Sequence, residues 1–148
     1  MFKKIVVGID GSTTSDNAVR IACDLATKYD SDIHLVHTPQ PQTVAFAMGA
    51  VAGYHAVTTM PSQDEVMEAA ARIIADATVV AAECGQSVAG AHTEQGDPAD
   101  HIIACAKAVG ADLIVTGRRG LGSIGSLVQG STSLRVNHLA KCATLSVI

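Results

Sequence analysis

The 148-residue sequence contains no tryptophan, and two tyrosines and two phenylalanines account for its 3% of aromatic residues. Proteins that stack single-stranded nucleic acid need several exposed rings, so this scarcity argues against that class. The formal net charge of −4 also argues against a generic nucleic-acid binder, because such proteins are usually basic. With 48% hydrophobic residues, the chain is expected to build a core from aliphatic side chains.

Long hydrophobic runs are also missing. No apolar stretch reaches the roughly 18 residues of a transmembrane helix, and the apolar residues after Lys3 and Lys4 end at Asp10, too early for a secretory signal. The four cysteines are scattered and form no Cys-x-x-Cys pair, which is typical of buried thiols in a reducing compartment. We expect a cytoplasmic protein without a membrane span, folded as one domain over residues 1–148.

What the sequence does contain is an alternation of β-branched runs with amphipathic patterns. The predicted strands are residues 4–9, 32–38, 86–94, 111–116 and 143–148, and the predicted helices are 15–29, 62–84, 97–109 and a short one ending near Lys141. Such alternation is typical of an α/β fold, a doubly wound open sheet of five mostly parallel strands with helices on both faces.

Two helix starts are well marked. Ser62 and Glu65 form a capping box, and Asp97 followed by Pro98 is a typical first turn. The uncharged segment from Pro39 to Pro61 has only a weak pattern. A connection of this length suggests a lid, an interface element or a mobile loop, and the simplest interpretation is an irregular loop with one or two helical turns.

The strongest chemical signal follows the fourth predicted strand, where Thr116 leads into the glycine-rich segment 117–132. Ligands of doubly wound sheets bind beyond the carboxyl ends of the strands, so this segment should face residues 10–12 if the first and fourth strands are neighbours. Its glycines can turn backbone N–H groups toward one point, and residues 130–132 begin a helix, which attracts anions. We predict a phosphate site.

Charge supports this prediction. Residues 113–148 carry four basic and no acidic side chains, a net charge of +4, whereas residues 1–112 carry six basic and fourteen acidic ones, a net charge of −8. Arg118 and Arg119 are the candidate residues on the phosphate side. The alternative is that a basic C-terminal third merely balances an acidic body.

Two familiar motifs do not fit. Gly120-x-Gly122-x-x-Gly125 matches the dinucleotide fingerprint, but no acidic residue follows Asp112 to hold a ribose. A Walker A loop would need lysine where Ser131 stands.

His34 and His37 are three residues apart and should lie on opposite faces of a strand. No catalytic constellation is evident, so we expect a phosphate ligand to be hydrolysed slowly at most.

The spacing Gly117, Gly120, Gly130, Ser131 matches the signature G-x2-G-x9-G-(S/T), and through it the chain resembles the ATP-binding members of the universal stress protein family, from Lys3 to Ile148. Residues 6–12 and 35–38 also match. The resemblance implies a Rossmann-like, adenine nucleotide alpha hydrolase-like fold with strand order 3-2-1-4-5. It also implies a nucleotide-dependent regulatory or sensing module in the stress response.

The resemblance further implies bound ATP, or another adenine nucleotide, with Mg or Mn. Asp10 would contact the nucleoside, Thr38 would lie against adenine, and the glycines and hydroxyl groups would hold ribose and phosphates. The candidate cofactor-binding residues are Asp10, Gly11, Ser12, Thr38, Thr116, Gly117, Arg118, Arg119, Gly120, Gly130, Ser131 and Thr132, and no residue is assigned to catalysis or to a metal.

A homodimer paired through the last strand, Thr144 to Ile148, is implied in the same way, although Cys142-Ala143-Thr144 stands where the family commonly has Cys-Pro-Val. A regulatory partner protein is also expected, but no nucleic acid. Two alternatives stay open, which are a nucleotide-independent homodimeric interaction module and a weak ATPase.

Overall fold

A computed structural model describes residues 1–49, 61–121 and 130–148. Residues 50–60 of the uncharged segment and residues 122–129 of the glycine-rich segment lie outside the described residues. The described elements are β1 (Lys4–Ile9), α1 (Thr13–Tyr29), β2 (Asp32–His37), α2 (Pro41–Ala47), α3 (Gln63–Glu83), β3 (Val88–Thr93), α4 (Pro98–Val109), β4 (Leu113–Gly117), α5 (Ser131–Leu139) and β5 (Ala143–Val147).

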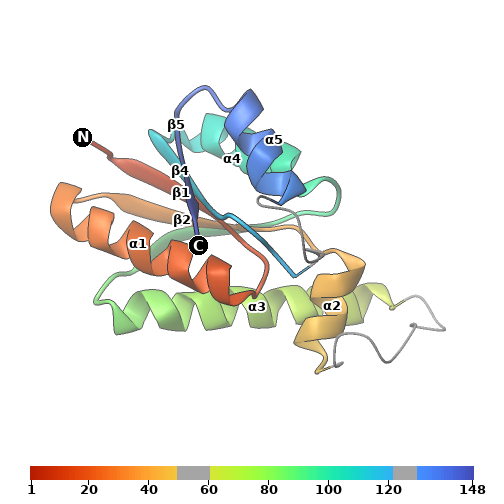
Figure 1. The fold of residues 1–148 in the computed structure, drawn as a ribbon. Helices are drawn as coiled ribbons and strands as arrows, with labels where there is room; N and C mark the ends of the chain where they lie inside the picture. The colour runs from red at the N-terminus through yellow and green to blue at the C-terminus, as the bar shows by residue number, and fades with distance from the viewer. Residues whose placement is uncertain (50–60, 122–129) are drawn as a thin grey trace.

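The five strands form one parallel sheet in the order β3-β2-β1-β4-β5, which confirms the predicted fold class and strand order. Helices α1 and α3 cover one face, and α4 and α5 cover the other (Figure 1). Because β1 and β4 are the central neighbours, the chain reverses its direction of winding between them. Their carboxyl ends are therefore where the fold leaves room for a ligand.

The core has two layers, one on each face of the sheet. Ile5, Val7 and Leu35 pack against α1 and α3, whereas Val6 and Ile114 pack against α4 and α5. This is the aliphatic interior that the scarcity of aromatic residues predicts. The outer strand β3 alternates between half-buried and exposed residues, because successive side chains point to opposite faces of the sheet.

The helix boundaries follow from the residues that cap them. The Ser62–Glu65 capping box is confirmed, with Ser62 Oγ accepting from Glu65 N at 3.3 Å and Glu65 Oε2 accepting from Ser62 N at 2.7 Å. Asp97 caps α4 as predicted. Helix α1 begins two residues earlier than expected, because Ser12 serves as its N-cap. In the described parts of the chain, no helix is both long and apolar enough to cross a membrane.

The segment after β2 begins with a short helix, which agrees with the expected one or two helical turns. Helix α2 starts where Gln40 N donates to Thr43 Oγ1 at 2.8 Å, and Thr43 and Val44 are buried. Its end lies beside α3 (Figure 1), where Arg72 donates to the Ala47 carbonyl at 3.3 Å. The helix therefore belongs to the rim of the sheet's carboxyl edge.

Candidate functional site

A cavity of about 500 Å³ lies at the carboxyl ends of β1, β2 and β4 and is bordered by the first turns of α4 and α5. This volume falls within the usual range for small-molecule sites. The lining residues are Gly8, Ile9, Asp10, Ser15, Val36, Thr38, Gln40, Thr43, Asp97, Pro98, Ala99, Ile102, Thr116, Gly117, Arg119, Gly120, Gly130, Ser131, Thr132, Ser133 and Arg135.

The structure brings most of the predicted site residues together around this cavity. Those in its lining are Asp10, Thr38, Thr116, Gly117, Arg119, Gly120, Gly130, Ser131 and Thr132. Gly11, Ser12 and Arg118 are not among the lining residues. Gly11 turns the chain with φ +84° beside the Phe46 ring, and Ser12 caps α1.

Asp10 joins the end of β1 to the segment that follows β4. Its Oδ1 accepts from the N–H and the hydroxyl of Ser12 at 2.9 and 2.5 Å, and its Oδ2 accepts from Leu121 N at 3.0 Å. A Cβ on Gly120 would lie 2.2 Å from Asp10 Oδ2. Any side chain at this position would therefore force the Asp10 carboxylate to shift away from its present contacts.

The two described ends of the glycine-rich segment are tied together. Gly130 N donates to the Arg118 carbonyl at 2.6 Å, and Ser133 Oγ donates to the same carbonyl at 3.1 Å. The Thr14 hydroxyl donates to the Arg119 carbonyl, and a Cβ on Gly117 would meet Thr14 Oγ1 at 2.9 Å. These contacts place the start of α5 at the cavity.

The start of α5 has the chemistry of an anion site. Its N-cap is Gly130, which has no side chain to accept from the first-turn N–H groups. Those groups have no acceptor within a helix and carry the positive end of its dipole. Ser131 and Thr132 add hydroxyl donors at the cavity wall. Together they can bind a phosphate group.

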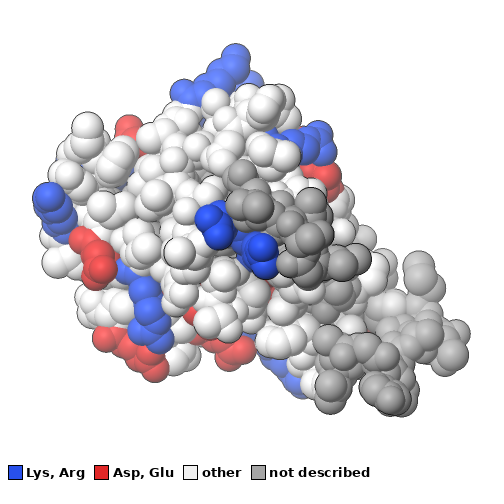
Figure 2. All heavy atoms as spheres, in the orientation of Figure 1, with Lys and Arg blue, Asp and Glu red and all other residues white. Residues whose placement is uncertain are grey.

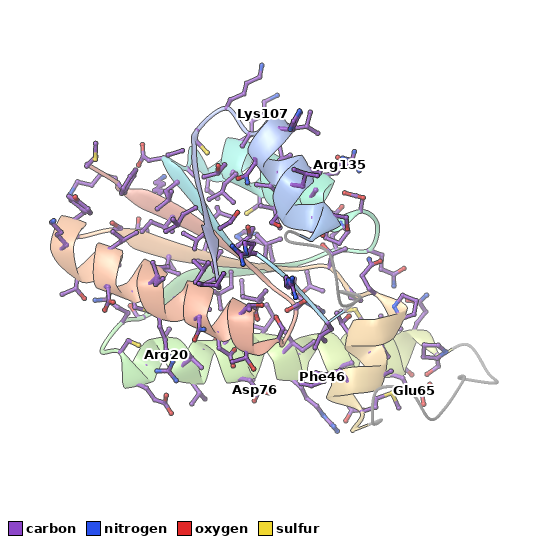
Figure 3. The ribbon with its side chains drawn as sticks, in the orientation of Figure 1. Arg20, Phe46, Glu65, Asp76, Lys107 and Arg135 are labelled. Atoms are coloured by element: carbon purple, nitrogen blue, oxygen red, sulfur yellow. The ribbon has the colours of Figure 1, made fainter. Side chains whose placement is uncertain are left out.

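Two cations at the cavity differ in how they are paired. In the described parts of the chain, the buried Nε atoms of Arg118 and Arg119 have no hydrogen-bond partner, and no acidic residue pairs with Arg119. Figure 2 shows basic side chains over the segment that leaves β4, near the centre of the view. Arg135 on α5, labelled in Figure 3, instead pairs with Asp97 at 2.9 Å and with Asp100 at 2.7 Å. Arg119 is therefore the better candidate to attract an anion into the cavity.

Thr38 is only 5% exposed and is connected to the surface by two side chains that sequence reasoning missed. Its hydroxyl lies 2.9 Å from Nδ1 of His101, and Nε2 of His101 contacts the Glu94 carboxylate. Thr38 follows β2, His101 is on α4 and Glu94 is in the β3–α4 connection, so no local sequence pattern marks them. The contact with His101 holds the Thr38 side chain at the cavity wall.

Other lining residues were missed because they are defined by packing. A Cβ on Gly8 would lie 2.5 Å from Ile102 Cδ1, so this glycine lets α4 approach the sheet and form one cavity wall. For Arg135, the sequence offered one indication, which was its position in the basic C-terminal third. No sequence feature indicated Gln40. Within the described ranges, no group of three or more His, Cys, Asp or Glu residues could hold a metal ion.

The predicted separation of His34 and His37 is confirmed. His37 is buried on the face of the α1–α3 layer, and its Nδ1 lies 2.9 Å from the Ile9 carbonyl. Burial lowers the pKa of His37, which favours a neutral ring. His37 is therefore a core histidine and does not face the cavity.

As a class, this is a doubly wound α/β protein with a ligand cavity at the point where the winding of its parallel sheet reverses. The chain belongs to the universal stress protein family, because the model of the Universal stress protein family matches residues 1–147.

Known proteins show the same relationship. The universal stress protein YxiE of Bacillus subtilis is 31% identical over 150 residues, which span 99% of each chain. A universal stress protein in complex with cAMP has a TM-score of 0.72 and 24% identity, covering 99% of this chain and 97% of that one. The universal stress protein from Archaeoglobus fulgidus in complex with dAMP has a TM-score of 0.69 and 20% identity, covering 99% and 98%. At these identities, the solved structures show a shared fold.

Proposed function

We propose that this protein binds an adenine nucleotide, ATP foremost, in the cavity between β1 and β4 and acts as a nucleotide-dependent sensing module in the stress response. The observation that carries the proposal is the convergence of three anion-binding features on one cavity. These are the start of α5, which has no side-chain cap among the described residues, the Nε of Arg119, which has no partner among them either, and the close backbone approach at Gly120. The cAMP and dAMP complexes of similarly folded proteins support the choice of an adenine nucleotide.

The described residues fit such a ligand. Gly130, Ser131 and Thr132 would bind phosphate oxygens through N–H and hydroxyl groups, and Arg119 would add charge-assisted hydrogen bonds. The base would lie toward β2, where Thr38 lines the wall. A divalent cation, Mg²⁺ or Mn²⁺, would accompany the nucleotide and neutralise part of its phosphate charge.

We propose sensing and not rapid turnover, because the acidic residues of the described cavity wall are already engaged. The Asp10 carboxylate accepts from Ser12 and Leu121. The Asp97 carboxylate caps α4 and pairs with Arg135. A carboxylate that activates water must be within hydrogen-bond reach of it, and these two are directed into protein contacts.

The proposal includes a cytoplasmic homodimer. Strand β5 is at one edge of the sheet, so its outer edge is available to the same strand of a second copy. Residues Thr144 to Ile148 would form that contact, with Leu145 and Ile148 exposed in the chain as described. All four cysteines are free thiols, which fits a reducing cytoplasm. A regulatory partner protein would bind according to whether the nucleotide is present.

The decisive experiment is to extract nucleotide from denatured purified protein and to titrate nucleotide-free protein with ATP, ADP, AMP and GTP, with and without Mg²⁺. We expect adenine nucleotide in the extract and saturable binding of ATP in preference to GTP. Absence of binding at millimolar ATP would refute the proposal. If the protein is nonetheless a dimer by light scattering, the nucleotide-independent interaction module becomes the better function.

That second function has an observation of its own in its favour. Phe46 and Met48, on and just after α2, are 49% and 52% exposed, and Met67 on α3 is 55% exposed. Phe46 and Met48 lie two residues apart at the end of α2, and neighbouring exposed apolar side chains are found on surfaces that bind other proteins. The nucleotide titration separates the two functions, because only the first depends on the cavity.

A further inference from the structure

Two histidines far apart in the sequence meet at one edge of the sheet. In the register of β2 and β3, His34 lies opposite Gly90 and Val36 lies opposite His92. Since side chains alternate along a strand, His34, Gly90 and His92 share the face that carries α4, to which Val36 also belongs. Nδ1 of His34 lies 3.4 Å from Nε2 of His92, and the two rings are tilted by 34°.

The separation of these nitrogens matches the geometry of a metal site. Two ligands of a tetrahedral ion with metal–nitrogen bonds of about 2.0–2.1 Å are about 3.4 Å apart. Imidazole nitrogen is a common ligand for Zn²⁺, Cu²⁺ and Ni²⁺, and it must be unprotonated to bind them. Burial lowers the pKa of His34, and the neighbouring His92 lowers it further, so the His34 ring is suited to the neutral form.

Gly90 leaves space directly beside both nitrogens. A Cβ at this position would lie 2.8 Å from His34 Nδ1 and 3.2 Å from His92 Nε2. Any side chain other than hydrogen would therefore occupy the space in front of the pair. Glycine inside a strand often marks a bulge or a close approach, and both apply at Gly90, because the pairing with β2 skips from Val88 to Gly90 and the two rings lie beside it.

Two charged side chains affect the His34 ring in opposite directions. Asp32 precedes His34 by two residues on the same face of β2 and favours positive charge at the ring, whereas Lys4 on the neighbouring strand β1 opposes it. No third His, Cys, Asp or Glu in the described residues completes a cluster. An ion held here would have two protein ligands and would complete its coordination with water.

We propose that His34 and His92 form a binding site for a divalent transition-metal ion of the imidazole-preferring class, Zn²⁺ foremost. Neither residue lines the cavity between β1 and β4. The site is therefore separate from the proposed nucleotide site and independent of whether a nucleotide binds. Its ion would join the edge strand β3 to β2.

The test is a titration of the nucleotide-free full-length protein with Zn²⁺ by calorimetry, and with Co²⁺ by visible absorption. We expect a saturable site that His34→Ala and His92→Ala each weaken by at least about tenfold, since ligand losses exceed the effect of altering outer-shell partners. His138→Ala, which removes an exposed histidine from α5, should leave the affinity unchanged. Lowering the pH to 5 should release the ion, because protons compete for the rings.

Gly90→Ala tests whether the ion is held between the two rings or by other histidines on the surface, because this variant keeps both rings and fills the space beside them. We expect it to weaken Zn²⁺ binding, with circular dichroism confirming the fold. If Gly90→Ala does not fold, the two histidine variants decide the result. Unchanged Zn²⁺ affinity in His34→Ala and His92→Ala, or in a folded Gly90→Ala, would overturn the proposal and leave a hydrogen-bonded histidine pair.

Discussion

Two aspartates hold opposite ends of the central strand pair β1–β4. Asp112 at the amino edge accepts from the backbone N–H groups of Lys3 and Lys4 at 2.7 and 3.0 Å. Asp10 at the carboxyl edge accepts from Ser12 and from Leu121, which follows β4. Each carboxylate links β1 with the chain next to β4 through backbone N–H groups. The hydrogen-bonding arrangement is therefore the same at both edges.

The surroundings of the two aspartates differ. Asp112 is exposed and lies beside lysines, and it simply joins the strands. Asp10 lines a cavity bordered by Gly120, by Arg119 and by the start of α5. The comparison teaches that a carboxylate held by backbone N–H groups is not itself a mark of function. The neighbours that leave space and supply positive charge make one edge a candidate site.

The largest effect should come from Gly120→Ala, which places a Cβ 2.2 Å from Asp10 Oδ2 and forces the carboxylate and the segment after β4 apart. Overpacking of this kind costs about 1–3 kcal/mol, so we expect ATP affinity to fall by up to about 100-fold. Calorimetric titration measures it. Gly110→Ala, at a glycine outside the cavity lining with nothing within 4 Å of an added Cβ, is the control and should keep the affinity.

Asp10→Asn should have the next largest effect and tests the comparison directly. It removes the charge that holds Ser12 and Leu121, and hydrogen bonds to charged groups contribute about 1.5–3 kcal/mol. We expect ATP affinity to fall by at least about tenfold. The matched change Asp112→Asn should leave it unaltered. Equal losses in the two variants would show that the cavity end has no special role.

A smaller effect is expected from His101→Ala, because His101 acts only through the Thr38 hydroxyl. A neutral hydrogen bond contributes about 0.5–1.5 kcal/mol, which corresponds to about a two- to tenfold loss of ATP affinity. Thr38→Val should cause a similar loss, and the double variant should lose no more than Thr38→Val alone. Additive losses in the calorimetric titration would show that the two side chains act separately.

The smallest effect should be seen at the amino edge, in stability and not in binding. The backbone N–H groups of Lys3 and Lys4 lower the pKa of Asp112. A lowered pKa in the folded state stabilises the protein above the unfolded pKa of about 3.9, and the stabilisation is lost as the pH falls through the folded pKa. Asp112→Asn should therefore lower the free energy of unfolding at pH 7 more than at pH 3. Urea denaturation at both pH values checks this, and a pH-independent difference would contradict it.

The elements that were predicted well are those fixed by local patterns. The capping box at Ser62 and the cap at Asp97 depend on residues three positions apart. The buried runs of β1 and β4 are continuous stretches of apolar sequence. The glycine-rich segment was recognised for the same reason. Of its predicted residues, Arg118 is not part of the cavity lining, because its carbonyl closes the segment onto Gly130.

Contacts between residues of distant elements could not be predicted. His92 and His101 had no recognisable ligand spacing in the sequence, yet the first lies beside His34 and the second beside Thr38. Arg135 meets Asp97 and Asp100 only because α5 packs beside α4. Each contact depends on strand register or helix placement, which no short sequence window contains.

The sequence by itself determined the alternation of strands and helices, the aliphatic core and the positions of the glycines, because periodicity, capping and backbone freedom are local properties of the chain. Only the tertiary structure decided which polar side chains meet. Parallel strands are joined through intervening helices, so residues about 60 positions apart, such as His34 and His92, become neighbours only when the register of the sheet is set.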